Sequence, residues 1–108
     1  MKFIKYQYTN YAWGFNEQEI HQIDFEKQEY KHCKNGVWDY TLKLTDEILS
    51  YIHTIFHKFE VEFPQNEFAY DAPMFSLTID DKTCTQIADT DHNSLYTMLL
   101  DVFDAFKK

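Results

Sequence analysis

The chain has 108 residues, of which 18 are acidic and 10 basic, so its formal charge at pH 7 is −8. This length suits one domain with one buried core. With 44 % apolar and 19 % aromatic residues, residues 1–108 are expected to form a single globular domain rather than a disordered or disulfide-dependent chain. All the basic residues are lysines. An acidic chain without arginine to grip phosphates is not expected to bind nucleic acid or an anionic membrane.

The sequence shows no pattern typical of a signal peptide, a membrane span or a cysteine motif. Residues 1–15 lack the continuous apolar run of a signal peptide, and no stretch approaches the roughly 18 apolar residues of a membrane span. Cys33 and Cys84 are too few and too far apart in sequence to suggest a metal motif or a disulfide framework. We therefore expect a cytoplasmic protein with two reduced thiols.

Alternating apolar and polar residues predict strands in the N-terminal third. A first strand covers residues 3–8, and a change of face near residues 9–10 would put Tyr11, Trp13 and Phe15 on one side. A second strand follows residue 16 and continues as a polar ribbon through residues 26–34. The Asn35-Gly36 pair predicts a type I′ turn into a third strand at residues 37–44. The expected inward residues of this third strand are Trp38, Tyr40, Leu42 and Leu44.

The hydrophobic period changes from two to 3.6 at Thr45, an N-cap candidate that opens a helix expected to end before Pro64. Residues 64–73 read as a loop, residues 75–88 as a hairpin that turns at residues 80–82, and residues 89–93 as cap candidates for a last helix. The order β-β-β-α-β-β-α predicts an α+β fold, an antiparallel sheet of four to five strands with two helices on one face. The predicted core contains Trp38, Leu42, Ile52, Phe56, Phe75, Leu77, Leu99 and Phe103.

Metal and cofactor chemistry finds little support in the sequence. His53, His57 and Glu60 have zinc-like spacing on the first predicted helix. A helical wheel, however, places both histidines opposite the apolar stripe, and the glutamate lies outside the pair rather than between them. We expect these residues to form a solvated face, and we predict neither a metal site nor a cofactor.

Catalytic motifs are also missing from the sequence. None of the serines lies in a G-x-S-x-G elbow, and glycine occurs only at positions 14 and 36, so there is no phosphate-binding loop. His32 and Cys33 are adjacent on a predicted strand, where neighbouring side chains point to opposite faces. We therefore predict no catalytic residue and no enzymatic activity.

Acidic side chains gather between residues 67 and 91, where the only basic residue is Lys82. Turn formation and helix capping account for most of them individually, and no glycine completes a calcium loop. If the turns are neighbours, these acids form one rim beside Phe68, Tyr70 and Phe75, since aromatic residues favour interface centres. The predicted partner-binding residues are Glu67, Tyr70, Asp71, Asp80, Asp81, Asp89 and Asp91.

In size, charge and element order, this arginine-free, aromatic-rich α+β chain resembles the immunity proteins of bacterial toxin systems and phage-encoded inhibitors of bacterial defence nucleases. The resemblance implies a binding function, in which the acidic side chains steer the chain to a basic toxin or nuclease and block its active site or substrate groove. Two alternatives stay open: a small-molecule-binding or enzymatic domain with a pocket between sheet and helices, and a generic partner-binding module.

Overall fold

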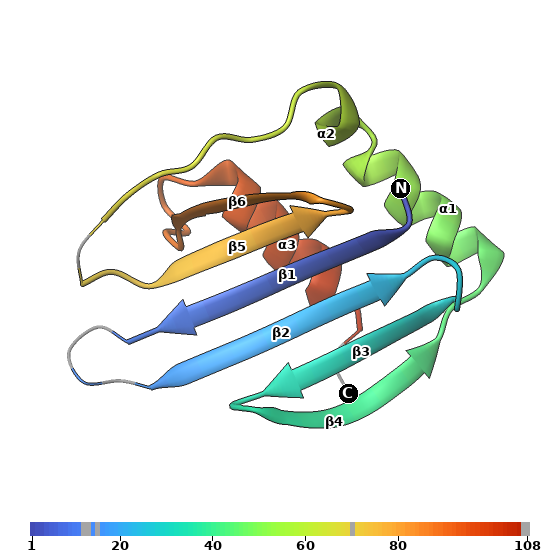
Figure 1. The fold of residues 1–108 in the computed structure, drawn as a ribbon, viewed down its shortest axis with the longest axis horizontal. Coiled ribbons are helices and arrows are strands. Elements are labelled where there is room, and N and C mark those ends of the chain that lie inside the picture. Colours follow the sequence, from blue (N-terminus) through green and yellow to red (C-terminus); the bar gives the residue numbers. More distant parts are fainter. Residues whose placement is uncertain (12–13, 15, 70, 107–108) are drawn as a thin grey trace.

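The protein is described here by a computed structural model that covers residues 1–11, 14, 16–69 and 71–106. Figure 1 shows a single antiparallel sheet of six strands, in the order β4-β3-β2-β1-β5-β6. The elements in chain order are β1 (Phe3–Asn10), β2 (Glu17–Asp24), β3 (Glu29–Lys34), β4 (Val37–Lys43), α1 (Asp46–Phe56), α2 (Lys58–Val61), β5 (Met74–Ile79), β6 (Lys82–Ile87) and α3 (Ser94–Asp104). The predicted α+β class is confirmed.

The described residues hold six strands and three helices, where four to five strands and two helices were predicted. The extra strand arises because the expected second ribbon folds back on itself at residues 25–28. This turn contains neither glycine nor proline. Instead, the Asp24 carboxylate accepts a hydrogen bond from the Lys27 amide at 2.9 Å, and Gln28 adopts a φ of 55°. A left-handed glutamine gives no turn signal in a sequence.

The helices begin where their caps predict. The Thr45 hydroxyl accepts a hydrogen bond from the Ile48 amide at 3.2 Å, and the Asn93 side chain accepts one from the Tyr96 amide at 3.0 Å. The first helix ends earlier than expected, because α1 stops at Phe56 and a separate turn of helix, α2, follows it. Among the described residues, no helix is long and apolar enough to cross a membrane.

One face of the sheet and the inner sides of α1 and α3 form a single core. α3 crosses behind the strands, and α1 lies along the end of the sheet where β1 begins (Figure 1). Six of the eight predicted core residues are buried in this cluster, and Leu42 packs at its edge. The buried members are Ile52, Phe56, Phe75, Leu77, Leu99 and Phe103.

Trp38 is the exception: it is 52 % exposed, so its predicted place in the core is wrong. In the β3–β4 ladder, Trp38 pairs with Cys33 and Tyr40 pairs with His32, which leaves Asp39 as an extra residue at a bulge. A bulge breaks the strict alternation of side chains. Tyr40 therefore faces the helices, as predicted, whereas Trp38 lies on the opposite face.

Candidate functional site

The loop after α2 is fastened along the outer edge of β6. The Glu67 amide donates to the Thr85 carbonyl at 2.8 Å, and the Asn66 side chain accepts from the Thr85 amide at 2.8 Å. The Gln86 side chain donates to the Gln65 carbonyl at 2.7 Å. The loop is therefore held in place although it contains no regular secondary structure.

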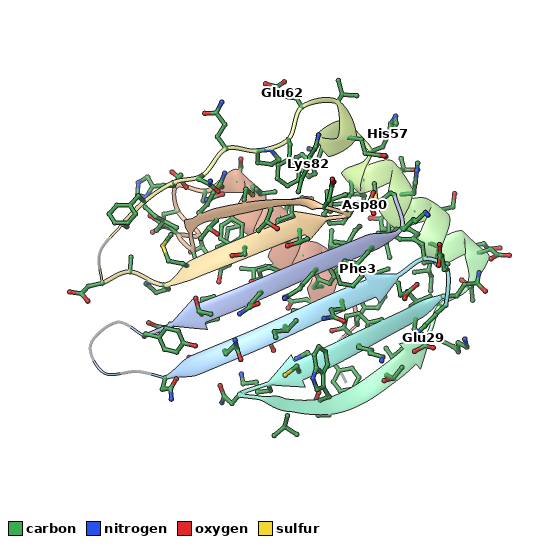
Figure 2. All side chains as sticks on the ribbon, in the orientation of Figure 1. Phe3, Glu29, His57, Glu62, Asp80 and Lys82 are labelled. Atoms are coloured by element: carbon green, nitrogen blue, oxygen red, sulfur yellow. The ribbon has the colours of Figure 1, made fainter. Side chains whose placement is uncertain are left out.

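A groove of about 780 Å³ lies between this loop and the start of α3. Its lining includes two carboxylates, Glu62 and Glu67, and one lysine, Lys58. Figure 2 labels Glu62 on the loop just beyond α2. We call this feature the loop groove; the residues lining it are Lys58, Phe59, Glu62–Glu67, Gln86 and His92–Leu95.

The predicted acidic residues divide between the two ends of the β5–β6 hairpin. Met74 pairs with Ile87 at one end, next to the segments that carry Glu67, Asp71, Asp89 and Asp91. Ile79 pairs with Lys82 at the other end, where Asp80 and Asp81 form the turn. Figure 2 shows Asp80 at this second end, close to the start of β1. The acids therefore form two groups rather than one rim.

Three of these carboxylates hold the fold together. Glu67 accepts from the Asn93 side chain at 3.3 Å, and Asp80 accepts from the Lys2 amide at 2.7 Å. Asp89 bonds the Asp91 amide and the His92 ring, and the His92 contact is the main reason that its pKa lies below the usual value. The three remaining acids, Asp71, Asp81 and Asp91, are exposed. Their carboxylates make no hydrogen bond or ion pair within the described part of the chain.

The aromatic residues near the acids also differ in their exposure. Phe68 is 79 % exposed on the fastened loop, whereas Phe75 is buried in the core. Tyr70, a predicted contact residue, lies outside the described residues, as do Trp13 and Phe15. Phe68, which follows the groove-lining Glu67 in the chain, is therefore the exposed aromatic among the described residues of this loop.

A separate, apolar groove of about 370 Å³ lies between β4, α1 and α3. A pocket between sheet and helices was one of the alternatives that the sequence left open. Apart from Lys43 and Tyr51, its lining side chains are hydrocarbon, and the Lys43 ammonium is already bound to the Lys27 carbonyl at 2.9 Å.

His53 on α1 and His57, which caps the end of this helix, are both exposed, as the helical wheel predicts. The Glu60 carboxylate nevertheless lies 3.2 Å from His57 Nδ1 and 3.9 Å from His53 Nε2, so the three side chains do meet. The hydrogen bond from His57 is the main cause of the lowered pKa of Glu60. These contacts lie at the surface.

A cluster that sequence reasoning missed lies inside the protein, on the helix-facing side of β2 and β3. His21 and His32 are paired across these strands and are 1 % and 5 % exposed. His21 Nε2 lies 3.2 Å from one carboxylate oxygen of Glu19, and His32 Nε2 lies 2.8 Å from the other. The two imidazoles thus converge on one carboxylate. We call these three residues the buried histidine cluster.

The other ring nitrogen of each histidine, Nδ1, also has a hydrogen-bond partner. The Tyr30 hydroxyl lies 2.6 Å from His21 Nδ1, and the Asp39 carboxylate lies 2.6 Å from His32 Nδ1. Burial raises the pKa of Tyr30, so its hydroxyl stays neutral. Lost hydration opposes ionisation of Asp39, but the His32 hydrogen bond and nearby backbone amides lower its pKa overall. Among the described residues, every buried side-chain nitrogen and oxygen has a partner.

The sequence contains a signal for only part of this cluster. Glu19 and His21 are two residues apart on a strand and therefore share a face. His32 joins them only through the register of β2 with β3, which depends on the turn at residues 25–28, and Asp39 joins through the bulge in β4. Neither of these last two features was predicted.

No family model matches the sequence, and neither a curated protein nor a solved structure matches the chain significantly.

Proposed function

We propose that this chain is an inhibitor or immunity-type protein that binds a basic protein partner, such as a toxin or nuclease, and blocks its active site or substrate groove without catalysis. The observation that carries the proposal is the loop groove, a recess lined by Glu62 and Glu67, together with the exposed Phe68 that follows Glu67 in the chain. The net charge of −8 is consistent with steering toward a basic surface.

The contact surface that we assign comprises Glu62, Glu67, Phe68, Asp71 and Asp91. Glu62, Asp71 and Asp91 are exposed, so they remain available to lysine or arginine side chains of a partner. The loop that carries Phe68 is already tied to β6, so little ordering is required when a partner binds. An exposed aromatic on a fastened loop that also carries acidic residues suits an anchor accompanied by steering charges.

Asp80, Asp81 and Asp89 enter this proposal differently from the sequence prediction. Asp80 and Asp81 lie at the other end of the hairpin, so they contribute to the overall charge rather than to the contact surface. Asp89 supports the turn that presents Asp91. Tyr70 remains a proposed contact from the sequence, two residues beyond Phe68.

Small-molecule binding in the apolar groove is the weaker candidate. Ligand pockets combine an apolar lining with a few polar groups that fix the ligand's orientation. Here the Lys43 ammonium is committed to a backbone carbonyl, and the lining offers no other charged group. The Tyr51 hydroxyl is the other polar side-chain group of the lining, so the groove offers few groups that could orient a ligand.

The test compares two variants as immobilised baits with the wild-type chain. The first carries Glu62→Gln, Phe68→Ala and Asp91→Asn in the contact surface. The matched control carries Glu26→Gln, Val37→Ala and Asp81→Asn, which remove two exposed acids and an exposed apolar side chain away from the contact surface. Each bait is exposed to lysate of the source cell, and the retained proteins are quantified by mass spectrometry.

We expect a basic protein to be retained by the wild-type chain and the control, and at least tenfold less by the contact-surface variant, since an anchor residue contributes about 2 kcal/mol or more. The purified partner should lose its activity when the wild-type chain is added in equal amount, and its association rate should fall with added salt. Retention of only acidic proteins or nucleic acids, or equal retention by all three baits, would contradict the proposal.

A further inference from the structure

We propose that the buried histidine cluster binds one divalent transition-metal ion of the zinc type, with His21, His32 and Glu19 as its ligands. This inference is independent of the partner-binding proposal, because the cluster lies on β2 and β3 whereas the loop groove lies beside β6 and α3. The argument begins with how the three side chains are placed.

The two strands bring the ligand atoms together without any loop. Glu19 and His21 share one face of β2, and His32 is the cross-strand partner of His21 on β3. The ligand atoms of the three side chains all lie within 4.8 Å of one another. Ligand atoms on a tetrahedral zinc ion lie about 3.3 Å apart, given bonds of about 2.0 to 2.2 Å. The two Nε2-to-oxygen distances, 3.2 Å to one Glu19 oxygen and 2.8 Å to the other, lie near this value.

Each histidine is oriented by a second group on its Nδ1 atom. Asp39 holds His32 and the Tyr30 hydroxyl holds His21, both at 2.6 Å. Histidines that bind metal ions through one ring nitrogen almost always bond such a partner with the other, which fixes the ring and its tautomer. Aromatic rings fix them further, since Tyr6 stacks on His21 and Tyr40 stacks on His32.

Charge balance favours a cation at this position. Glu19 and Asp39 place two carboxylates against the His32 ring. A divalent ion bound to Nε2 of two neutral imidazoles would balance these two negative charges. In that state each ring carries its proton at Nδ1, where His32 donates it to Asp39 and His21 donates it to the Tyr30 hydroxyl.

The donor set indicates the class of metal. Two imidazole nitrogens and one carboxylate suit zinc and neighbouring divalent transition metals, whereas calcium and magnesium prefer all-oxygen sites. The two histidines are almost fully buried, while the Glu19 side chain is 17 % exposed. Solvent therefore reaches the cluster from the carboxylate side, where water can complete the coordination.

The exposed trio of His53, His57 and Glu60 is the competing site among the residues that the structure describes. The experiment therefore uses the full chain without a histidine tag and with the substitutions His53→Gln and His57→Gln. Both side chains are exposed, so this double variant should fold like the wild type. After treatment with a chelator, it is titrated with zinc by calorimetry and with cobalt by visible absorption.

We expect the double variant to bind one zinc ion per chain and to develop the visible absorption of tetrahedral cobalt. Adding Asp39→Asn should weaken zinc binding by about 10 to 100-fold, because Asp39 orients a ligand without touching the metal. Adding His32→Gln should abolish the cobalt absorption. Because the Asp39 side chain is 40 % exposed, its variant should remain folded, and the comparison holds even if the His32 variant is unstable.

If the double variant binds no zinc or cobalt while the wild-type chain does, the metal belongs to α1 and the proposal is overturned. Failure of both proteins to bind either metal overturns it equally. An unchanged affinity after Asp39→Asn would show that the ion is held elsewhere. None of these results bears on the loop groove, so the partner-binding proposal would fail or stand on its own test.

Discussion

Asp80 shows how much one surface carboxylate does in this fold. It adopts a φ of 54° in the β5–β6 turn, and one of its oxygens accepts hydrogen bonds from the amides of Lys2 and Phe3, at 2.7 Å and 3.1 Å. It thereby ties the turn to the start of β1. The Lys2 amide is the main cause of the lowered pKa of Asp80, opposed by lost hydration and assisted by the Phe3 amide.

The first prediction concerns the acid stability of the protein. Because the pKa of Asp80 is lower in the folded chain than its usual 3.8, the ionised side chain stabilises the fold above that value. This contribution is lost as the pH falls through the lowered pKa. Asp80→Asn should therefore unfold at lower urea concentration than the wild type at pH 7, and the difference should disappear in strong acid.

The control for this prediction is Asp81→Asn, which removes the neighbouring exposed acid. It should leave the urea midpoint close to the wild-type value at every pH, since Asp81 makes no hydrogen bond within the described residues. A gap between Asp80→Asn and the wild type that stays constant down to the most acidic pH would show that ionisation of Asp80 is not its source.

At the scale of elements, the start of α3 is a junction where the helix is hydrogen-bonded to β6 and to the loop after α2. Besides capping the helix, the Asn93 side chain donates to the Ile87 carbonyl and to the Gln86 side chain, each at 3.0 Å. It also donates to Glu67 at 3.3 Å, so one amide joins α3, β6 and the loop. Thr45, by contrast, caps only its own helix through the Ile48 amide.

The second prediction compares these two caps. Loss of an ordinary N-cap costs about 1 kcal/mol, and loss of a further hydrogen bond costs about 0.5 to 1.5 kcal/mol more. Asn93→Ala should therefore lower the free energy of unfolding by more than Thr45→Ala does, measured by urea denaturation. Asn93→Asp keeps the capping oxygen but loses the side-chain donor. Its loss of unfolding free energy should therefore lie closer to that of Asn93→Ala than to that of Thr45→Ala. Equal effects of the Asn93→Ala and Thr45→Ala changes would show that the junction adds no stability.

At the scale of the whole molecule, the sheet and helices share one core around Phe103. Its ring lies 5.5 Å from Tyr6 and 5.1 Å from His21 on the sheet, and 6.4 Å from Phe56 on α1. The side chain is only 1 % exposed. Phe103 therefore connects α3 to the sheet and to α1 at once.

The third prediction is that Phe103→Ala strongly destabilises the chain. Truncation of a buried phenylalanine costs about 3 to 5 kcal/mol, a large share of the roughly 5 to 15 kcal/mol that stabilises a small domain. The urea midpoint should shift accordingly. Phe68→Ala removes the same atoms from an exposed position and should shift it little. Similar shifts for the two variants would mean that α3 does not pack on the sheet as described.

Much of the fold follows from neighbouring residues alone. The positive φ values of Asn35 and Gly36, the cap at Thr45 and the alternation in β5 are confirmed because each depends on residues within a few positions of one another. The predicted α+β class follows from the same local periods. Local chemistry also explains why His53 and His57 are exposed.

Only the tertiary structure decided where distant residues meet. The left-handed Gln28 and the extra Asp39 set the pairing of β2, β3 and β4, and that pairing places Trp38 outside while it brings His32 to His21 and Glu19. The antiparallel hairpin likewise separates Asp80 and Asp81 from Asp89 and Asp91, because its strands carry the two turns to opposite ends. Strand register joins residues across long stretches of chain, and a shift of a single residue reverses which side chains share a face.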